Sequence, residues 1–157
     1  MKRERTEKTT VKKKGILFAV LLLFLVFAAV PGAYGQQAYN AVALEYFKLS
    51  LEYLIIGDYD NTILYCTYVL RIDPNSAVAY TVRARAYFER GNMENVIADC
   101  TQALRFDRNN ISALSIRASA HERMGNMDRA IADWRAILRI NPENSEARRN
   151  IELASQQ

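Results

Sequence analysis

The sequence has little of what most catalytic sites require. Its 157 residues include one histidine, His121, and two cysteines, Cys66 and Cys100, and it has no pair of cysteines separated by two residues. A metal site, a dithiol redox centre and a histidine-based nucleophile therefore have no supporting motif, and no glycine-rich phosphate loop is present. These absences predict a protein that is not an enzyme and that uses no metal or cofactor.

Most of the chain also lacks a surplus of either positive or negative charge. The formal charge is +4, but residues 1–35 carry seven basic and two acidic side chains, whereas residues 36–157 carry 14 and 15. The body is nearly neutral, so a nucleic-acid partner is not expected. Its cations are thirteen arginines and Lys48 alone, which we expect to form a solvated face with weak ion pairs.

Proline is scarce, and one of the three prolines ends a segment typical of an export signal. A basic stretch (1–14) precedes fifteen residues without a polar side chain (16–30), then Pro31-Gly32 and small residues at 33 and 35. This order predicts a signal peptide over residues 1–35, cleaved before Gln36, and a periplasmic or secreted protein. The alternative is an uncleaved inner-membrane anchor over residues 15–34, with the rest of the chain still outside the cytoplasm.

Three of the six glycines stand at equal intervals and divide the remaining sequence into units of one length. Gly57, Gly91 and Gly125 each follow a helix-compatible stretch and precede another. A fixed period between about 20 and 50 residues indicates one supersecondary unit, here a pair of helices, that is copied and stacked. With each glycine numbered as position 15, the units are Ala43–Ser76, Ala77–Asn110 and Ile111–Asn144.

The repeated positions alternate large and small side chains at helical spacing. Position 4 is always large and position 8 always small, and position 24 holds Cys66, Cys100 and Trp134. Small residues let helices approach closely while large neighbours fill the grooves. Equivalent positions on stacked helices lie about 10 Å apart, beyond the reach of a disulfide, so we expect free buried thiols. We also expect His121, at the otherwise aromatic position 11, to pack in the core.

This pattern resembles the tetratricopeptide repeat family. The resemblance covers residues 43–144 and implies an all-α protein, a right-handed α-solenoid of three helix-turn-helix units. We expect residues 36–42 to extend the first helix and residues 145–157 to form a capping helix. Arg83 and Arg117 depart from the pattern, because the family usually has an apolar residue at that position, so the pattern says less about local packing there, while the predicted fold is unaffected.

The resemblance also implies where a partner would bind. In the family, positions 2, 5, 9 and 12 of successive first helices line a concave groove. Here these positions are apolar at the amino end and polar at the carboxyl end, which predicts a site for an amphipathic or extended peptide, with Arg85 pairing an acidic group. The predicted groove residues are Leu44, Phe47, Leu51, Leu54, Val78, Arg85 and Phe88, followed by Ser112, Ser115, Ser119 and Glu122.

The resemblance leaves several functions open. Some members of the family grip the free carboxylate of a peptide with cations, but the corresponding positions here hold Phe47, Leu51, Val82, Ser112 and Ile116, so such a receptor is not expected. The leading hypothesis is an exported adaptor that holds a protein or peptide partner. The alternatives are a membrane-anchored subunit that organises an envelope or secretion complex, and a groove covered by residues 36–42 or by a second copy. We expect Phe47→Glu to abolish partner capture without lowering the melting temperature.

Overall fold

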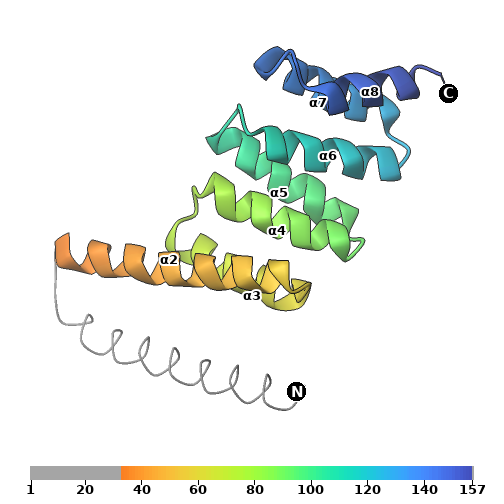
Figure 1. Ribbon diagram of the computed structural model, residues 1–157. Coiled ribbons are helices and arrows are strands. Elements are labelled where there is room, and N and C mark those ends of the chain that lie inside the picture. The colour runs from red at the N-terminus through yellow and green to blue at the C-terminus, as the bar shows by residue number, and fades with distance from the viewer. Residues whose placement is uncertain (1–32, 157) are drawn as a thin grey trace. The chain divides into compact units, whose positions relative to one another are not determined.

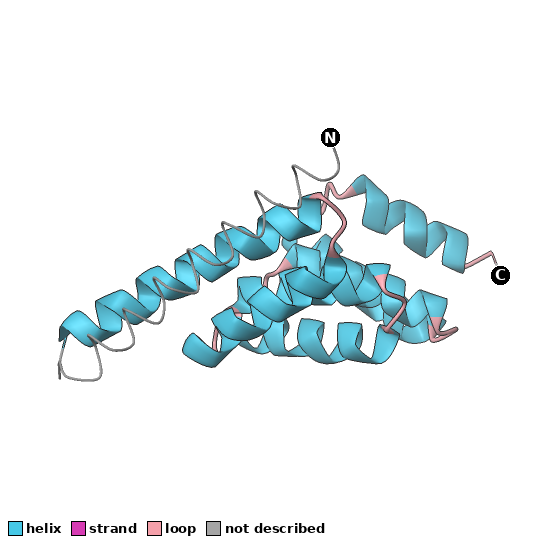
Figure 2. Ribbon diagram, turned by 90° about the horizontal axis from the view of Figure 1, so that it is seen from below, coloured by secondary structure: helices cyan, strands magenta, loops and turns pink. Residues whose placement is uncertain are grey.

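The computed structural model describes residues 33–156, and within that range it contains helices and no strand (Figures 1 and 2). The prediction of an all-α repeat fold is therefore confirmed. None of these helices combines the length and the apolar content needed to cross a bilayer. The apolar run at 16–30 lies outside the described residues. The helices are α2 (Ala33–Ile55), α3 (Tyr59–Ile72), α4 (Ala77–Glu89), α5 (Met93–Phe106), α6 (Ile111–Arg123), α7 (Met127–Ile140) and α8 (Ser145–Ala154).

The chain divides into two compact units, Met1–Val42 and Ala43–Gln157. The described part of the first unit is the amino-terminal part of α2, which contains residues 36–42. The second unit holds the repeats. Within it, each helix from α3 to α8 packs against its neighbours in sequence, and α4 also contacts α6. Two successive first helices therefore lie side by side, as the stacked pairs in Figure 1 show.

A glycine with a left-handed backbone closes each turn inside a helix pair. In the second pair, the N–H of Gly91 donates to the carbonyl of Phe88 (3.1 Å) and the N–H of Asn92 donates to that of Tyr87 (3.0 Å). These bonds satisfy carbonyls at the end of α4, and they require a conformation in which glycine has no steric penalty. The turn glycines have φ values of +76° at Gly57, +76° at Gly91 and +73° at Gly125.

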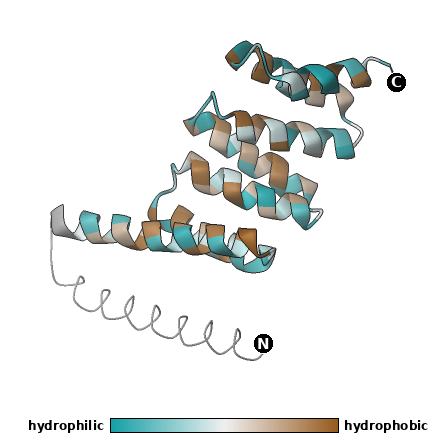
Figure 3. Cartoon of the chain, viewed as in Figure 1, coloured by the Kyte–Doolittle hydropathy of each residue, from teal (hydrophilic) through white to brown (hydrophobic). Residues whose placement is uncertain are grey.

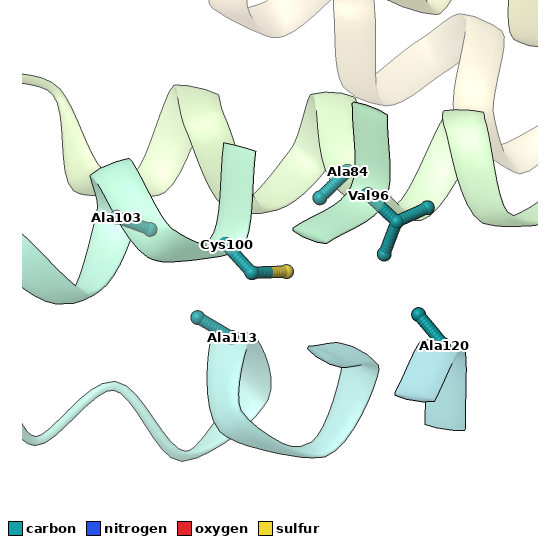
Figure 4. Packing of buried hydrophobic residues seen from close by; sticks show 6 residues of the cluster. All are labelled: Ala84, Val96, Cys100, Ala103, Ala113 and Ala120. Atoms are coloured by element: carbon teal, nitrogen blue, oxygen red, sulfur yellow. The ribbon is translucent and has the colours of Figure 1, made fainter. Parts of the chain in front are cut away.

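The core repeats with the period of the sequence. Every helix from α4 to α7 carries both hydrophobic and hydrophilic residues (Figure 3). Small buried residues of neighbouring helices pack together in the core clusters. Figure 4 shows six side chains from the layer between α4, α5 and α6, and all six are fully buried. Alanine dominates this layer because close helix approach needs small side chains. The six residues shown are Ala84, Val96, Cys100, Ala103, Ala113 and Ala120.

Position 24 supplies a buried side chain in every unit. Cys66 and Cys100 are free and fully buried, and Trp134 is 2% exposed. Burial raises the pKa of the Cys66 thiol to about 11 and that of Cys100 to about 12. Both thiols are therefore protonated at neutral pH and serve as small apolar groups.

Arg83, at a position that the family usually fills with an apolar residue, joins three helices. Its Nε and Nη2 donate to the two carboxylate oxygens of Asp99 on α5, at 2.7 and 2.8 Å, and its Nη1 donates to Oγ1 of Thr67 on α3, at 3.0 Å. The Asp99 side chain is only 8% exposed. This bidentate pair connects α4 with the second helix of its own unit, and the third bond connects it with the unit before.

Arg117 repeats this arrangement one unit later. It donates to both carboxylate oxygens of Asp133, at 2.9 and 2.7 Å, and to Oγ1 of Thr101, at 3.1 Å. The expectation of a solvated face is thus wrong for Arg83 and Arg117. The signal in the sequence was that each arginine stands midway between a threonine and an aspartate, at the same separation in both units. We refer to these two networks as the arginine ladders.

The ends of the repeat array are charged where its interior is apolar. Position 3 and position 10 hold Glu45 and Glu52 in α2, and both are exposed. On α8, Arg148 and Glu152 are exposed as well. A further helix stacked on α2 would have to bury the carboxylate of Glu52 and the exposed ion pair between Glu45 and Lys48, which is costly. The buried alanines at these two positions in later helices are Ala79, Ala113, Ala147, Ala86 and Ala120.

His121 is buried in the third unit beside the second arginine ladder. The residue is 6% exposed, and its Nδ1 has no hydrogen-bond partner within residues 33–156. Burial lowers the pKa of the imidazole; Asp133 opposes this effect, and Arg117 and Arg129 add to it. As the pH falls below about 6.5, the unfolded chain binds the proton first, so the folded state loses stability until the folded pKa is passed.

Replacing His121 should remove this pH dependence. The matched variant is His121→Tyr, because Tyr53 and Tyr87 occupy the same position in the other units. We expect the wild type to lose stability between pH 7.5 and pH 5.5 and the variant to lose much less, measured by denaturant unfolding at both pH values. Since the chain has one histidine, equal losses in the two proteins would contradict the assignment.

Candidate peptide-binding face

Contacts between α4 and α6 define a shared surface of the first helices. Asn110, at the start of α6, donates from Nδ2 to Oγ1 of Thr81 on α4 (3.2 Å). The guanidinium carbon of Arg123 on α6 lies 3.9 Å from the centroid of the Phe88 ring. Thr81 and Phe88 are positions 5 and 12 of α4, two of the positions predicted to face a groove. We refer to positions 2, 5, 9, 12 and 13 of α2, α4 and α6 as the first-helix face.

Three aliphatic residues of this face are open to solvent, one of which is Ile55 at position 13 of α2, 84% exposed. Leu44 is 53% exposed and Val78 is 55% exposed, and both occupy position 2. Leu51 and Leu54 are half-buried. Arg85, which we expected to pair with an acidic partner group, is exposed but already pairs with Glu89 of its own helix, with 3.0 Å between Nε and Oε1. The exposed apolar surface is therefore narrower than the sequence pattern suggested, and it comprises position 2 of α2 and α4 and position 13 of α2.

The two aromatic residues of the face also belong to the core. Phe47 is half-buried and packs against the buried cluster of Val69, Leu70 and Ala79. Phe88 is half-buried and packs against the cluster between α4, α5 and α6. A glutamate at position 47 would place a carboxylate against apolar side chains. Phe47→Glu is therefore expected to lower the melting temperature, in contrast to the expectation from the sequence.

The carboxyl-terminal part of the face is polar. Ser112 and Glu122 of α6 are exposed, and Ser115 and Ser119 are half-buried. Hydroxyl groups here can donate and accept hydrogen bonds but carry no charge.

No three potential metal ligands lie together in the described part of the chain. On α8, a concavity of about 500 Å³ is lined by Ser145, Glu146, Arg149, Asn150 and Leu153.

The fold and this face define a helical-repeat protein built from stacked helix pairs. The family model described as the ETO1 C-terminal domain matches residues 37–156. The chain therefore belongs to this family, which is similar to the tetratricopeptide repeats, and it is a tetratricopeptide repeat protein. A comparison with curated proteins gave no match.

Solved structures of tetratricopeptide repeat (TPR) domains have the same fold. The first such domain of human RPAP3 is 30% identical, over 73% of this chain and 90% of that chain, with a TM-score of 0.69. The first TPR of Spaghetti (RPAP3), solved with the HSP90 peptide SRMEEVD, has the same identity and coverage and a TM-score of 0.70. The TPR2B domain of yeast Sti1, solved in a complex with pHsp70, is 26% identical, over 73% of this chain and 97% of that chain, with a TM-score of 0.68.

Proposed function

We propose that this protein is an adaptor that holds a segment of a partner protein on its first-helix face and catalyses no reaction. The observation that carries the proposal is the exposure of Leu44 and Val78, at 53% and 55%, at the same position of successive first helices. Burial of this aliphatic surface by a partner removes it from water and so lowers the free energy of the complex. The relatives support the proposal, because domains of RPAP3 and Sti1 were solved with HSP90 and Hsp70 ligands.

The proposed partner segment is not the free carboxyl end of a chaperone. Of the five positions that would grip a terminal carboxylate, Phe47, Leu51, Val82 and Ile116 are apolar and Ser112 is neutral. A carboxylate placed there would lose hydration without meeting a cation. We therefore propose an internal segment of the partner, bound through apolar side chains at the amino end of the face.

The adaptor proposal is tested by crosslinking the chain to its partner in cells and identifying that partner by mass spectrometry. The variant Leu44→Glu/Val78→Glu should reduce capture of the identified partner at least tenfold, because it places two charges on the apolar surface. The matched control is Leu64→Glu on α3, a leucine that is 42% exposed outside the face. Equal capture by both variants would show that the partner binds elsewhere.

We further propose that the repeats act outside the cytoplasm, as a free exported adaptor. The support is the basic and apolar order of residues 1–35. The second candidate is an anchored subunit, in which residues 15–34 stay in the membrane and the repeats organise an envelope complex. Mass spectrometry of the mature amino terminus decides between them: a terminus at Gln36 in the soluble fraction supports the first, and an intact terminus in the membrane fraction supports the second.

A second copy of the chain is the alternative occupant of the first-helix face. In that case the wild type would sediment as a dimer, and Leu44→Glu/Val78→Glu would sediment as a monomer. A wild type that is monomeric in analytical ultracentrifugation leaves the face open for a different protein, as the adaptor proposal requires.

A further inference from the structure

We propose that Arg123, held over the ring of Phe88, recognises a single acidic side chain next to an apolar residue in the bound segment. The inference rests on the proposed adaptor function, because it assigns the chemistry of the partner on the first-helix face. The central contact is the distance of 3.9 Å between the guanidinium carbon of Arg123 and the ring centroid of Phe88. It places a cation over a half-buried aromatic ring of the face.

Arg123 is the cation of this face that the fold leaves without an anion. Lys48 and Arg85 are paired with glutamates on their own helices. Arg90, in the turn after α4, is paired with Asp60. Within residues 33–156, no ion pair involves Arg123. Arg149 on α8 is also unpaired there, but it shares its concavity with Glu146.

The ring contact prepares Arg123 to bind a carboxylate. A guanidinium over an aromatic ring is attracted by the ring quadrupole, and it loses part of its hydration there. Its N–H groups point outward in the guanidinium plane, where they match the two oxygens of a carboxylate. Since the contact already restricts the side chain, less conformational entropy is lost on binding. The half-buried ring of Phe88 places this cation next to apolar surface.

The neighbouring Glu122 limits the partner to one acidic group at this place. Glu122 is exposed and precedes Arg123 in α6. A second carboxylate beside the first would meet its negative charge, and like charges repel. A peptide with consecutive acids, such as the SRMEEVD peptide of the RPAP3 complex, is therefore disfavoured. The preferred segment has an apolar side chain for Leu44 and Val78 and one acid for Arg123.

Selection from a phage library of internal 12-residue peptides tests the inference, because the displayed peptides have no free carboxyl end. The full chain, purified as its host processes it, is compared with Arg123→Gln and with the control Arg139→Gln. Both arginines are exposed and lie in the last turn of a helix, so the two changes remove the same helix-dipole interaction. Wild type and control should enrich an acid beside apolar residues, and Arg123→Gln should enrich the apolar residues alone.

The binding affinity of a peptide from the wild-type selection then shows how much Arg123 contributes. Arg123→Gln should weaken its binding about tenfold, which is typical of one charge-assisted pair at a partly exposed site. Replacing the acid of the peptide by its amide should weaken binding to the wild type equally and cause no further loss with Arg123→Gln. SRMEEVD should bind more weakly than the selected peptide.

Two kinds of failure are distinguishable. An acid preference that survives in Arg123→Gln, or a wild type that selects apolar peptides without an acid, overturns the inference and leaves the adaptor function standing. Binding of SRMEEVD as tight as that of the selected peptide also overturns it. If no peptide is enriched over the Leu44→Glu/Val78→Glu variant, both the adaptor function and the inference fail.

Discussion

Asp99→Ala is expected to lower the free energy of unfolding by about 3 kcal/mol. The change removes the bidentate partner of Arg83, whose side chain is only 18% exposed, and leaves its charge between α3, α4 and α5 without that anion. Breaking a buried ion pair is costly for this reason, and the partial exposure of the arginine places the estimate at the lower end of the range. Denaturant unfolding followed by circular dichroism measures the loss.

The first repeat supplies the matched control for this ladder. Leu49 and Tyr65 occupy the positions that hold Arg83 and Asp99 in the second repeat. The double variant Arg83→Leu/Asp99→Tyr should recover most of the stability lost in Asp99→Ala, because an apolar pair needs no charge compensation. If Asp99→Ala costs less than about 1 kcal/mol, the pair behaves as a solvated surface pair, and our description of the ladder is wrong.

Trp134→Ala is expected to lower the free energy of unfolding by about 4 kcal/mol. The indole is 2% exposed and packs in a cluster with Leu114, Ile137 and Ala147, so its removal leaves a cavity between α6, α7 and α8. Circular dichroism is the suitable measurement because the chain has no other tryptophan. The control Leu153→Ala, at a residue 52% exposed on α8, should change stability by less than about 0.5 kcal/mol.

The loss in Trp134→Ala should also be local, because each repeat contacts only its neighbours. Cys100 on α5 adjoins the weakened unit, and Cys66 lies one unit further away. Labelling with a thiol reagent under native conditions should therefore modify Cys100 faster in the variant, while Cys66 stays protected. Equal acceleration at both thiols would indicate that the array unfolds as a single cooperative unit.

The regular parts of the fold could be predicted because their causes are local in sequence. Gly91 ends a helix through its own backbone conformation, and alanine at position 8 permits close packing wherever two helices meet. Such signals recur at the same positions of successive units, so three copies identify them without knowledge of the tertiary structure. The fold class follows directly from this repetition.

The arginine ladders and the candidate site depended on contacts that no local rule supplies. From the sequence alone, Arg83 is expected to be an exposed cation. Only the structure shows that Thr67 and Asp99 lie beside it. The repeat period predicts that Phe88 faces outward. In the structure Phe88 is half-buried, because it packs against the cluster between α4, α5 and α6 and the guanidinium of Arg123 lies over its ring. That contact joins residues of successive repeats, so it was not visible from the positions within one repeat.

The glutamates on α2 and the polar outer side of α8 determine how this protein can change in length. Because Glu45 and Glu52 replace the alanines on which a preceding pair would stack, a copy added before the first repeat would find no complementary surface. A duplicate of residues 77–110 inserted after the original would pack its own alanines against the preceding repeat, and the alanines of the following repeat would pack against it. Genetic growth of the array is therefore confined to its interior, and the first-helix face can lengthen without any change at either terminus of the array.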